Sequence, residues 1–125
     1  MKHIFLDTSF LVHCAQWKLD FISEIDRIVQ EQYKFVVVSP VFEELTRLEH
    51  EKGELKFTAK LAQSILKLLG ADLLESTQKT ADQAILEFAK KENLVATHDA
   101  ELKRKLKAKS IHSLVIRQKK YIELV

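Results

Sequence analysis

Acidic side chains at four places in the chain could together perform metal-assisted chemistry. They are Asp7, Glu44, Asp82 and Asp99. A set of carboxylates with no His or Cys in register favours Mg²⁺ or Mn²⁺ over Zn²⁺ as the bound ion. The five histidines are scattered and lack the spacing of a zinc site. Whether the acids can share one ion depends on the elements that carry them.

Asp7 ends a short apolar run at residues 4–6, and Thr8 and Ser9 follow it. A run this short favours a strand over a helix. A buried strand that presents a carboxylate and two hydroxyls at its C-terminal end indicates an open α/β sheet, where ligands bind just beyond the strand ends. Asp7 would then be the first metal ligand. Equally open, on this stretch alone, is a role as N-cap of the next helix.

A helix predicted over residues 80–92 carries Asp82 inside its apolar sector. At about 100° per residue, Asp82 lies under Leu86 and close in angle to Ala89. Burying an unpaired carboxylate is costly, so this group should be protonated, paired or bound to metal. The alternative is an acid placed in the first helical turn, where the helix dipole favours it.

A second predicted helix, over residues 40–48, carries two neighbouring acids with different surroundings. Glu43 points away from the apolar face and should be solvated, whereas Glu44 lies on the border of that face and can look into a cleft. An ordinary interfacial role for Glu44 is equally open.

Asp99 follows a predicted strand end, as Asp7 does, and Thr97 adds a hydroxyl just before it. Asp99 could simply cap the helix that begins at Ala100. A capping box is excluded because Leu102 stands where Glu or Gln would be needed. Acids at parallel strand ends and in the first turns of the following helices can all converge on one edge of a sheet.

Strands alternate with helices along the whole chain, which predicts βαβ units and a mainly parallel sheet covered on both faces. We expect right-handed crossovers between the parallel strands. Strands are predicted at residues 4–6, 34–38, 71–74, 94–97, 113–117 and 121–125, and helices at 20–32, 40–48, 55–69, 80–92 and 100–108.

Two of these helices have well-marked features. Ser39 should be the N-cap of the second helix, with Pro40 at its first position. Gly70 should end the helix over residues 55–69. That helix should turn one apolar stripe inward, consisting of Phe57, Leu61, Ile65 and Leu68.

Composition places the chain among ordinary globular proteins. A length of 125 residues with 46% apolar and 30% charged residues fits one soluble domain with a proper core. No apolar run approaches the length of a membrane span, and no signal peptide is apparent, so we expect a cytoplasmic protein. The single cysteine, Cys14, should be a buried structural thiol.

Charge is distributed unevenly along the chain. Residues 1–98 carry a net charge of −3 and residues 99–125 a net charge of +5. A run of charges is usually a solvated face, and the functional alternative is an anchor for phosphates. The candidate phosphate-binding residues are Lys103, Arg104, Lys105, Arg117, Lys119 and Lys120.

Taken in order, these motifs make the chain resemble the PIN-domain ribonucleases nearly from end to end. The matching segments are Asp-Thr-Ser at residues 7–9, Glu-Leu at 44–45, Ala-Asp-x-x-Ile-Leu at 81–86 and Val-Ala-Thr-x-Asp-x-x-Leu at 95–102, with a basic helix after the last. The last segment is the most specific. The terminal residues 117–121, with a short strand after them, look like those of archaeal members.

The resemblance implies a three-layer α/β/α sandwich with a mainly parallel central sheet. It also implies a metal-dependent endoribonuclease that hydrolyses phosphodiester bonds in single-stranded RNA. Mg²⁺ or Mn²⁺ would be surrounded by Asp7, Glu44, Asp82 and Asp99, with Thr8, Ser9 and Thr97 as supporting polar residues.

Two positions depart from the family pattern. Gln83 stands where members of this type often have a second Asp, and His98 stands where they often have Asn. Gln83 affects whether a second metal ion can bind, and His98 affects the hydrogen bonding near the scissile phosphate.

The resemblance leaves two biological roles open, a toxin of the VapBC type held by an antitoxin and an RNA-processing nuclease. Members commonly form homodimers, so we expect a dimer. A PIN-fold scaffold without catalysis is a further alternative. A phospho-acceptor receiver domain is disfavoured because Asp7 has no acidic neighbour and residues 39–70 contain no Asp.

Overall fold

One six-stranded sheet runs through the middle of the computed structural model, which describes all residues from 1 to 125. In spatial order its strands are β3 (Asp72–Leu74), β2 (Tyr33–Val38), β1 (Lys2–Leu6), β4 (Leu94–Ala96), β5 (His112–Arg117) and β6 (Tyr121–Leu124). All neighbouring pairs are parallel except β5 and β6, which pair antiparallel. The predicted, mainly parallel sheet is confirmed.

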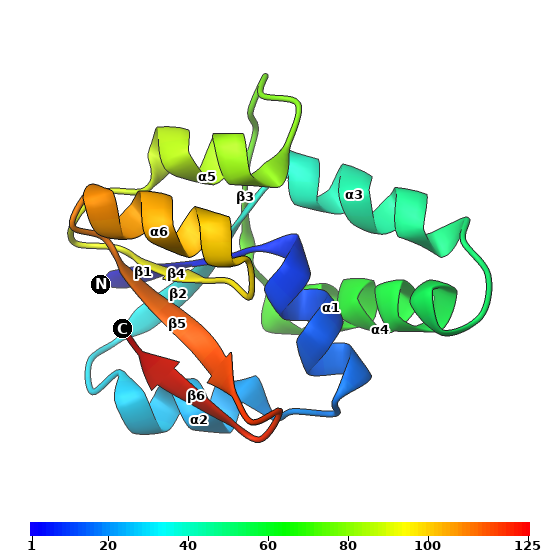
Figure 1. Ribbon diagram of the computed structural model, residues 1–125, viewed down its shortest axis with the longest axis horizontal. Helices are drawn as coiled ribbons and strands as arrows, with labels where there is room; N and C mark the ends of the chain where they lie inside the picture. Colours follow the sequence, from blue (N-terminus) through cyan, green and yellow to red (C-terminus); the bar gives the residue numbers. More distant parts are fainter.

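Helices cover both faces of this sheet, as Figure 1 shows. They are α1 (Thr8–Gln16), α2 (Phe21–Ile28), α3 (Ser39–Glu49), α4 (Glu54–Leu69), α5 (Ala81–Phe88) and α6 (Ala100–Ala108). In the view of Figure 1, α5 and α6 lie above the sheet, α2 and α4 lie below it, and α3 packs beside α5. The three-layer α/β/α sandwich expected from the sequence is confirmed.

The winding of the sheet reverses between β1 and β4. The chain moves outward in one direction through β1, β2 and β3, and then returns to the other side of β1 for β4 and β5. The register pairs Leu6 with Ala96, so the two strand ends lie side by side. In open α/β sheets, ligands bind in the crevice outside the carboxyl ends of strands at such a reversal.

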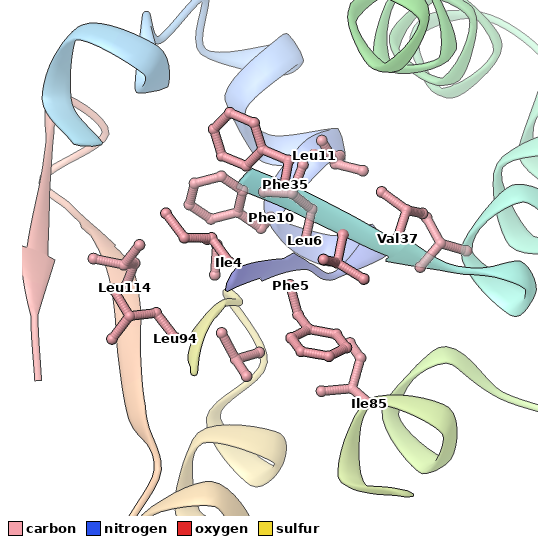
Figure 2. Packing of buried hydrophobic residues seen from close by; sticks show 14 of the residues in the cluster. Ile4, Phe5, Leu6, Phe10, Leu11, Phe35, Val37, Ile85, Leu94 and Leu114 are labelled. Carbon is pink, nitrogen blue, oxygen red and sulfur yellow. The ribbon is translucent and has the colours of Figure 1, made fainter. Parts of the chain in front are cut away.

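The last three residues of the central strand β1 are buried, because β2 and β4 pair with its two edges and helices cover both faces of the sheet. Its side chains alternate, so Phe5 points toward Ile85 of α5 while Ile4 and Leu6 point toward Phe10 on the other side (Figure 2). Each of these fully buried side chains stabilises the fold by about 1.5–3 kcal/mol. The strand is therefore a rigid base for the residues that follow it.

Most predicted elements are found within a few residues of their expected bounds. Helix α1 has no counterpart among the predicted ranges, and three details of the other elements differ. Helices α2 and α5 end at Ile28 and Phe88, four residues earlier than predicted. The prediction of Ser39 as N-cap is wrong, because Val38 takes that position. The hydroxyl of Ser39 instead accepts a hydrogen bond of 2.9 Å from the backbone N–H of Ser76.

The predicted inward face of α4 is also wrong. Phe57, Leu61 and Leu68 are 80%, 46% and 87% exposed, and Ile65 is only partly buried. The buried residues of the helix are Thr58, Ala59, Ala62 and Leu66. Small side chains face inward because α4 packs closely against α1 and α3. Gly70 ends the helix in the left-handed conformation, as predicted.

Two further expectations concern single features of the chain. Cys14 is buried, and burial raises the pKa of its thiol well above the ordinary value, so the predicted structural thiol is confirmed. None of the helices combines the length and the apolar character that crossing a membrane would require.

Candidate active site

The carboxylate of Asp7 lies at the point where the winding of the sheet reverses, between the end of β1 and the start of α1. It is 5% exposed. The hydroxyls of Thr97 and Ser9 donate hydrogen bonds of 2.8 and 2.9 Å to its Oδ2 atom. The backbone N–H of Thr8 donates one of 2.9 Å to Oδ1. Two segments of chain, residues 7–9 and the end of β4, therefore meet at this side chain. Asp7 is also the N-cap of α1, so the capping role that the sequence left open for it is present.

Burial raises the pKa of Asp7 above its ordinary value. Hydrogen bonds from Thr97, Ser9 and Thr8 act in the opposite direction, and the nearby negative charge of Glu44 raises the pKa further. No Lys or Arg forms an ion pair with Asp7. A buried carboxylate without a positive partner is unfavourable, so a cation at this place would relieve it.

Glu44 is half-buried, whereas Glu43 beside it is exposed, as the sequence predicts. The Oε2 atom of Glu44 accepts a hydrogen bond of 2.8 Å from the backbone N–H of Ala81, the first residue of α5. This contact ties α3 to the N-terminus of α5. Asp82 follows directly and is half-buried at the border of the buried face of α5, rather than enclosed in it.

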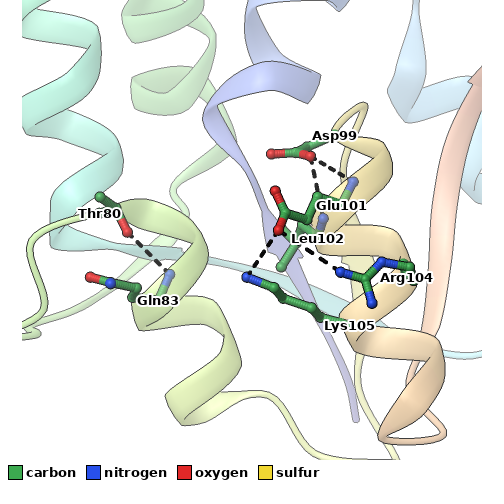
Figure 3. A network of polar contacts seen from close by, with 7 residues as sticks. All are labelled: Thr80, Gln83, Asp99, Glu101, Leu102, Arg104 and Lys105. Atoms are coloured by element: carbon green, nitrogen blue, oxygen red, sulfur yellow. Dashed lines mark hydrogen bonds and ion pairs between the residues drawn. The ribbon is translucent and has the colours of Figure 1, made fainter.

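Asp99 is exposed and acts as the N-cap of α6. Its Oδ1 atom accepts hydrogen bonds from the backbone N–H groups of Glu101 and Leu102, at 2.8 and 3.3 Å (Figure 3). The capping role that the sequence left open for Asp99 is therefore present. Its own backbone N–H donates to the hydroxyl of Thr97 at 3.0 Å. Thr97 thus connects Asp99 to the carboxylate of Asp7.

The four acids lie at one edge of the sheet, but they do not form a cluster of three metal ligands. No three acidic, His or Cys side chains are close enough together to hold an ion. None of the four acids takes part in an ion pair. Mg²⁺ is usually held by one or two carboxylates, with water and substrate phosphates completing its coordination.

Carboxylate oxygens are ligands that a hard divalent cation prefers, and Asp7 and Glu44 are close enough for the charge of Glu44 to raise the pKa of Asp7. Thr8 supports the fit of such a cation, because its hydroxyl is buried beside Asp7 and has no hydrogen-bond partner. A buried hydroxyl without a partner is unfavourable, so a hydrogen-bonding or coordinating group brought to it would relieve this cost.

Basic residues line a groove next to the acids. A cavity of about 680 Å³ between α6 and β5 is lined by Lys103, Arg104, Lys107 and Arg117, among others. A smaller pocket of about 90 Å³ shares Lys103 and Arg117 with it and reaches Thr97 and Asp99. The predicted phosphate-binding residues of α6 and β5 therefore lead directly to the acidic edge.

The other predicted RNA-binding residues, Lys105, Lys119 and Lys120, do not line this groove. Glu101 partly neutralises Arg104 of the groove, at 3.9 Å, and Lys105, at 3.6 Å (Figure 3). Such exposed pairs are weak, at about 0–1 kcal/mol each. Lys119 and Lys120 lie in the turn between β5 and β6, beside Trp17.

A group of aromatic rings near the acids was not predicted. His13 stacks on Trp17 at 4.6 Å between ring centroids, and His98 lies 4.4 Å from His13 and 5.3 Å from Trp17. Partial burial, with His13 and Lys103 nearby, lowers the pKa of His98. The spacing of four residues between His13 and Trp17 could have indicated their contact, but nothing in the sequence places His98 against them.

Comparison with known proteins agrees with this fold. A family described as a PIN like domain matches residues 4–119. The chain therefore belongs to the PIN-like domain family, and the resemblance inferred from the sequence motifs is confirmed.

Three relatives illustrate the match. The chain is 41% identical to a protein named Ribonuclease VapC4 from Methanocaldococcus jannaschii, over 99% of this chain and 97% of that one. The structure of the PIN domain endonuclease Utp24 superposes with a TM-score of 0.75 at 26% identity, covering 97% of this chain and 90% of that one.

The third relative shares the fold alone. It is a domain of a functionally unknown protein from Methanocaldococcus jannaschii, with a TM-score of 0.64 at 15% identity, covering 94% of this chain and 92% of that one.

Proposed function

We propose that this protein is an endoribonuclease that hydrolyses phosphodiester bonds in single-stranded RNA with Mg²⁺ or Mn²⁺. The buried, unpaired carboxylate of Asp7 at the reversal point of the sheet carries this proposal. Support comes from the 41% identity to a protein named as a ribonuclease. PIN-domain ribonucleases are generally dependent on a divalent metal ion.

Asp7 and Glu44 would be the direct ligands of the ion, and Asp82 and Asp99 the further acids at the same edge. A bound divalent ion lowers the pKa of an attacking water and stabilises charge on the leaving oxygen. The hydroxyls of Ser9 and Thr97 fix the orientation of the Asp7 carboxylate through their hydrogen bonds. Such supporting contacts hold a ligand in the geometry that the reaction needs.

The basic groove would bind the RNA backbone. Lys103, Arg104 and Arg117 line it and lead to the acids, so they would neutralise the phosphates nearest the cleaved bond. Lys105, Lys119 and Lys120 would add to the local positive field. Binding through such contacts weakens as salt concentration rises.

The test is cleavage of labelled single-stranded RNA with Mg²⁺ or Mn²⁺, with and without EDTA. The variants are Asp7→Asn, Glu44→Gln and, as a matched control, Glu43→Gln. We expect no cleavage in EDTA and a 10- to 100-fold or greater loss, an order-of-magnitude estimate, in the first two variants. Glu43→Gln should stay within about twofold of the wild type, because its side chain is exposed.

Cleavage that persists in EDTA would refute the proposed mechanism. Full activity of Asp7→Asn would refute it as well. Equal losses in Glu43→Gln and Glu44→Gln would remove Glu44 from the site.

A PIN-fold scaffold that binds RNA without cutting it is the rival function. Three features favour it: no three-ligand cluster is present, Asp99 is engaged in capping α6, and Gln83 and His98 replace residues common in the family. A scaffold would bind Mn²⁺ weakly or not at all, which titration calorimetry measures directly.

The biological role would be that of a VapBC-type toxin or of an RNA-processing nuclease. The relative named Ribonuclease VapC4 supports the first role, in which an antitoxin would insert near the acidic cleft. A small antitoxin-like reading frame immediately upstream of the gene would favour the toxin, and its absence would favour the processing nuclease.

A homodimer formed through α4 accounts for the exposed apolar stripe of that helix. Phe57, Leu61 and Leu68 are spaced by four and seven residues, so they form one stripe that a second copy of α4 can cover across a twofold axis. Light scattering should show a dimer for the wild type and a monomer for Leu68→Glu, with the exposed Lys60→Glu as control. A monomeric wild type would contradict this assembly.

A further inference from the structure

Three aromatic rings from two distant parts of the chain meet next to the acidic edge. His13 belongs to α1, Trp17 follows the end of that helix, and His98 comes from the loop between β4 and α6. Their ring centroids are 4.4 to 5.3 Å apart. The rings of His98 and Trp17 are nearly perpendicular, at 81°. His98 is exposed and the other two are half-buried, so the group presents a ring to solvent.

The aromatic group is firmly tied to the site. The backbone N–H of His98 donates a hydrogen bond of 3.1 Å to the hydroxyl of Ser9, and the same hydroxyl donates to Asp7. His98 is also the residue between Thr97 and Asp99. A molecule bound against these acids would therefore have its neighbouring part next to the ring of His98.

Positive charges surround the aromatic group. The amino group of Lys119 lies 5.4 Å from the centre of the Trp17 ring. Lys103 and Arg117 line the same small pocket as His98. Aromatic faces set among cations are how proteins bind single-stranded nucleic acid, because each base has a flat face to stack and each phosphate a charge to neutralise.

We propose that His13, Trp17 and His98 form a stacking subsite for a base of single-stranded RNA, next to the acids at the ends of β1 and β4. The RNA substrate in this statement rests on the function proposed above. A base in a duplex is already stacked on its neighbours, so the subsite selects unpaired RNA. The subsite assigns a role to His98, which departs from the family pattern.

The alternative is a purely structural role, in which the three rings only pack the end of α1 against the loop after β4. Under that reading, substitutions change the stability of the fold and leave RNA binding unaffected. The two readings differ in whether the rings respond to an added base.

Trp17 is the only tryptophan of the chain, so its fluorescence reports on this group alone. We would titrate the wild-type protein, in EDTA to prevent cleavage, with a short single-stranded oligouridylate and an oligoadenylate. An abasic ribose-phosphate oligomer of equal length would serve as the control for charge. Both oligonucleotides should quench the fluorescence, and the abasic oligomer should not. Equal quenching by all three would overturn the proposal.

Variants then separate stacking from folding, with binding of labelled RNA followed by fluorescence anisotropy in EDTA. His98→Ala should weaken binding about tenfold, within the range of one base stacked on an aromatic side chain. His98→Phe, which keeps a ring, should restore most of the affinity. His50→Ala removes an exposed histidine at the end of α3 and is the matched control.

Wild-type affinity in His98→Ala, or equal losses in His98→Ala and His98→Phe, would overturn the subsite. Because these measurements are made without metal, they do not depend on catalysis. If the binding measurements give the expected results but the protein never cleaves RNA, the subsite is supported and the proposed function is refuted. If the protein cleaves RNA but the binding measurements do not give the expected results, the function is supported and the subsite is refuted.

Discussion

Asp7 and Asp99 occupy equivalent places in two neighbouring strand–helix units, yet their surroundings are opposite. Each follows the end of a parallel strand and precedes a helix, β1 and α1 for Asp7 and β4 and α6 for Asp99. Asp7 is 5% exposed, and two hydroxyls donate to its carboxylate. Asp99 is exposed and accepts backbone N–H groups of its own helix.

The difference shows that position along a strand does not decide what an acid does. Both acids are N-caps of the helices that follow them, where the helix dipole favours a negative charge. Asp99 accepts two backbone N–H groups of its helix and is exposed to solvent. Asp7 bonds only one backbone N–H, that of Thr8, and remains a buried charge without a cation. Burial without a partner therefore marks Asp7, rather than Asp99, as the centre of the site.

The largest effect should come from Asp7→Asn. Loss of the buried charge should reduce RNA cleavage by more than about 100-fold, since it removes a proposed metal ligand rather than a supporting contact. Single-turnover cleavage at saturating Mn²⁺ measures this. If Asp99→Asn reduces cleavage more than Asp7→Asn does, the contrast between the two acids is wrong.

Thr97→Val should have the next largest effect, because Thr97 connects the two acids. The hydroxyl of Thr97 donates to Asp7 and accepts from the backbone N–H of Asp99. We expect a 10- to 100-fold loss of cleavage, an order-of-magnitude figure for a supporting residue, and a loss of about 1–3 kcal/mol in unfolding free energy. Thr97→Ser keeps the hydroxyl and should retain most of the cleavage activity and most of the unfolding free energy. If Thr97→Ser loses them as Thr97→Val does, the cause is lost packing of the methyl group rather than the lost hydroxyl.

Two substitutions at Asp99 separate the effect of its negative charge on cleavage from the effect of its helix-capping role on stability. Asn caps a helix as well as Asp does, whereas Ala costs about 1 kcal/mol. Asp99→Asn should therefore leave the stability of the fold unchanged and reduce cleavage about tenfold, a smaller loss than that of a direct ligand. Asp99→Ala should reduce both. Chemical denaturation and cleavage assays measure the two, and full activity of Asp99→Asn would leave Asp99 a capping role only.

The smallest effect is on stability and depends on pH. Burial raises the pKa of Asp7 above the unfolded value of about 3.9. The folded state therefore binds more protons than the unfolded state in this range, and wild-type stability falls as pH rises through it. Asn does not titrate. In EDTA, Asp7→Asn should have the same unfolding free energy as the wild type below this range and a larger one at neutral pH.

Denaturation curves from pH 3.5 to pH 8 give the difference in unfolding free energy between Asp7→Asn and the wild type. The contributions of the other titrating groups cancel in this difference because both proteins contain them. A difference that stays constant with pH would mean that the Asp7 carboxylate is not destabilised by its burial.

The sequence predicts the fold well because its strands and helices have clear local signals. The β-branched run of β2 and the left-handed stop at Gly70 are properties of a few adjacent residues. The acids at strand ends could be placed at one edge of the sheet from parallel topology alone. Their burial could not, because it depends on contacts from other strands, such as that of Thr97 with Asp7.

Two errors have the same physical origin. The apolar stripe of α4 was expected to face inward, but the helix buries its small residues, such as Ala59 and Ala62, against α1 and α3. An apolar stripe on a helix indicates a face that is unfavourable to expose to water. It does not identify the part of the protein, or the second copy, that buries this face. Likewise, the contact of His98 with Trp17 joins segments 81 residues apart, and local periodicity cannot predict it.

The central claim is that Asp7 is the buried partner of a divalent cation. Titration calorimetry of Mn²⁺ into metal-free protein tests it most directly, with wild type, Asp7→Asn and the exposed-acid control Glu43→Gln compared. We predict saturable binding by the wild type and by Glu43→Gln, and none by Asp7→Asn. Equal binding by all three proteins, or none by the wild type, would contradict the account.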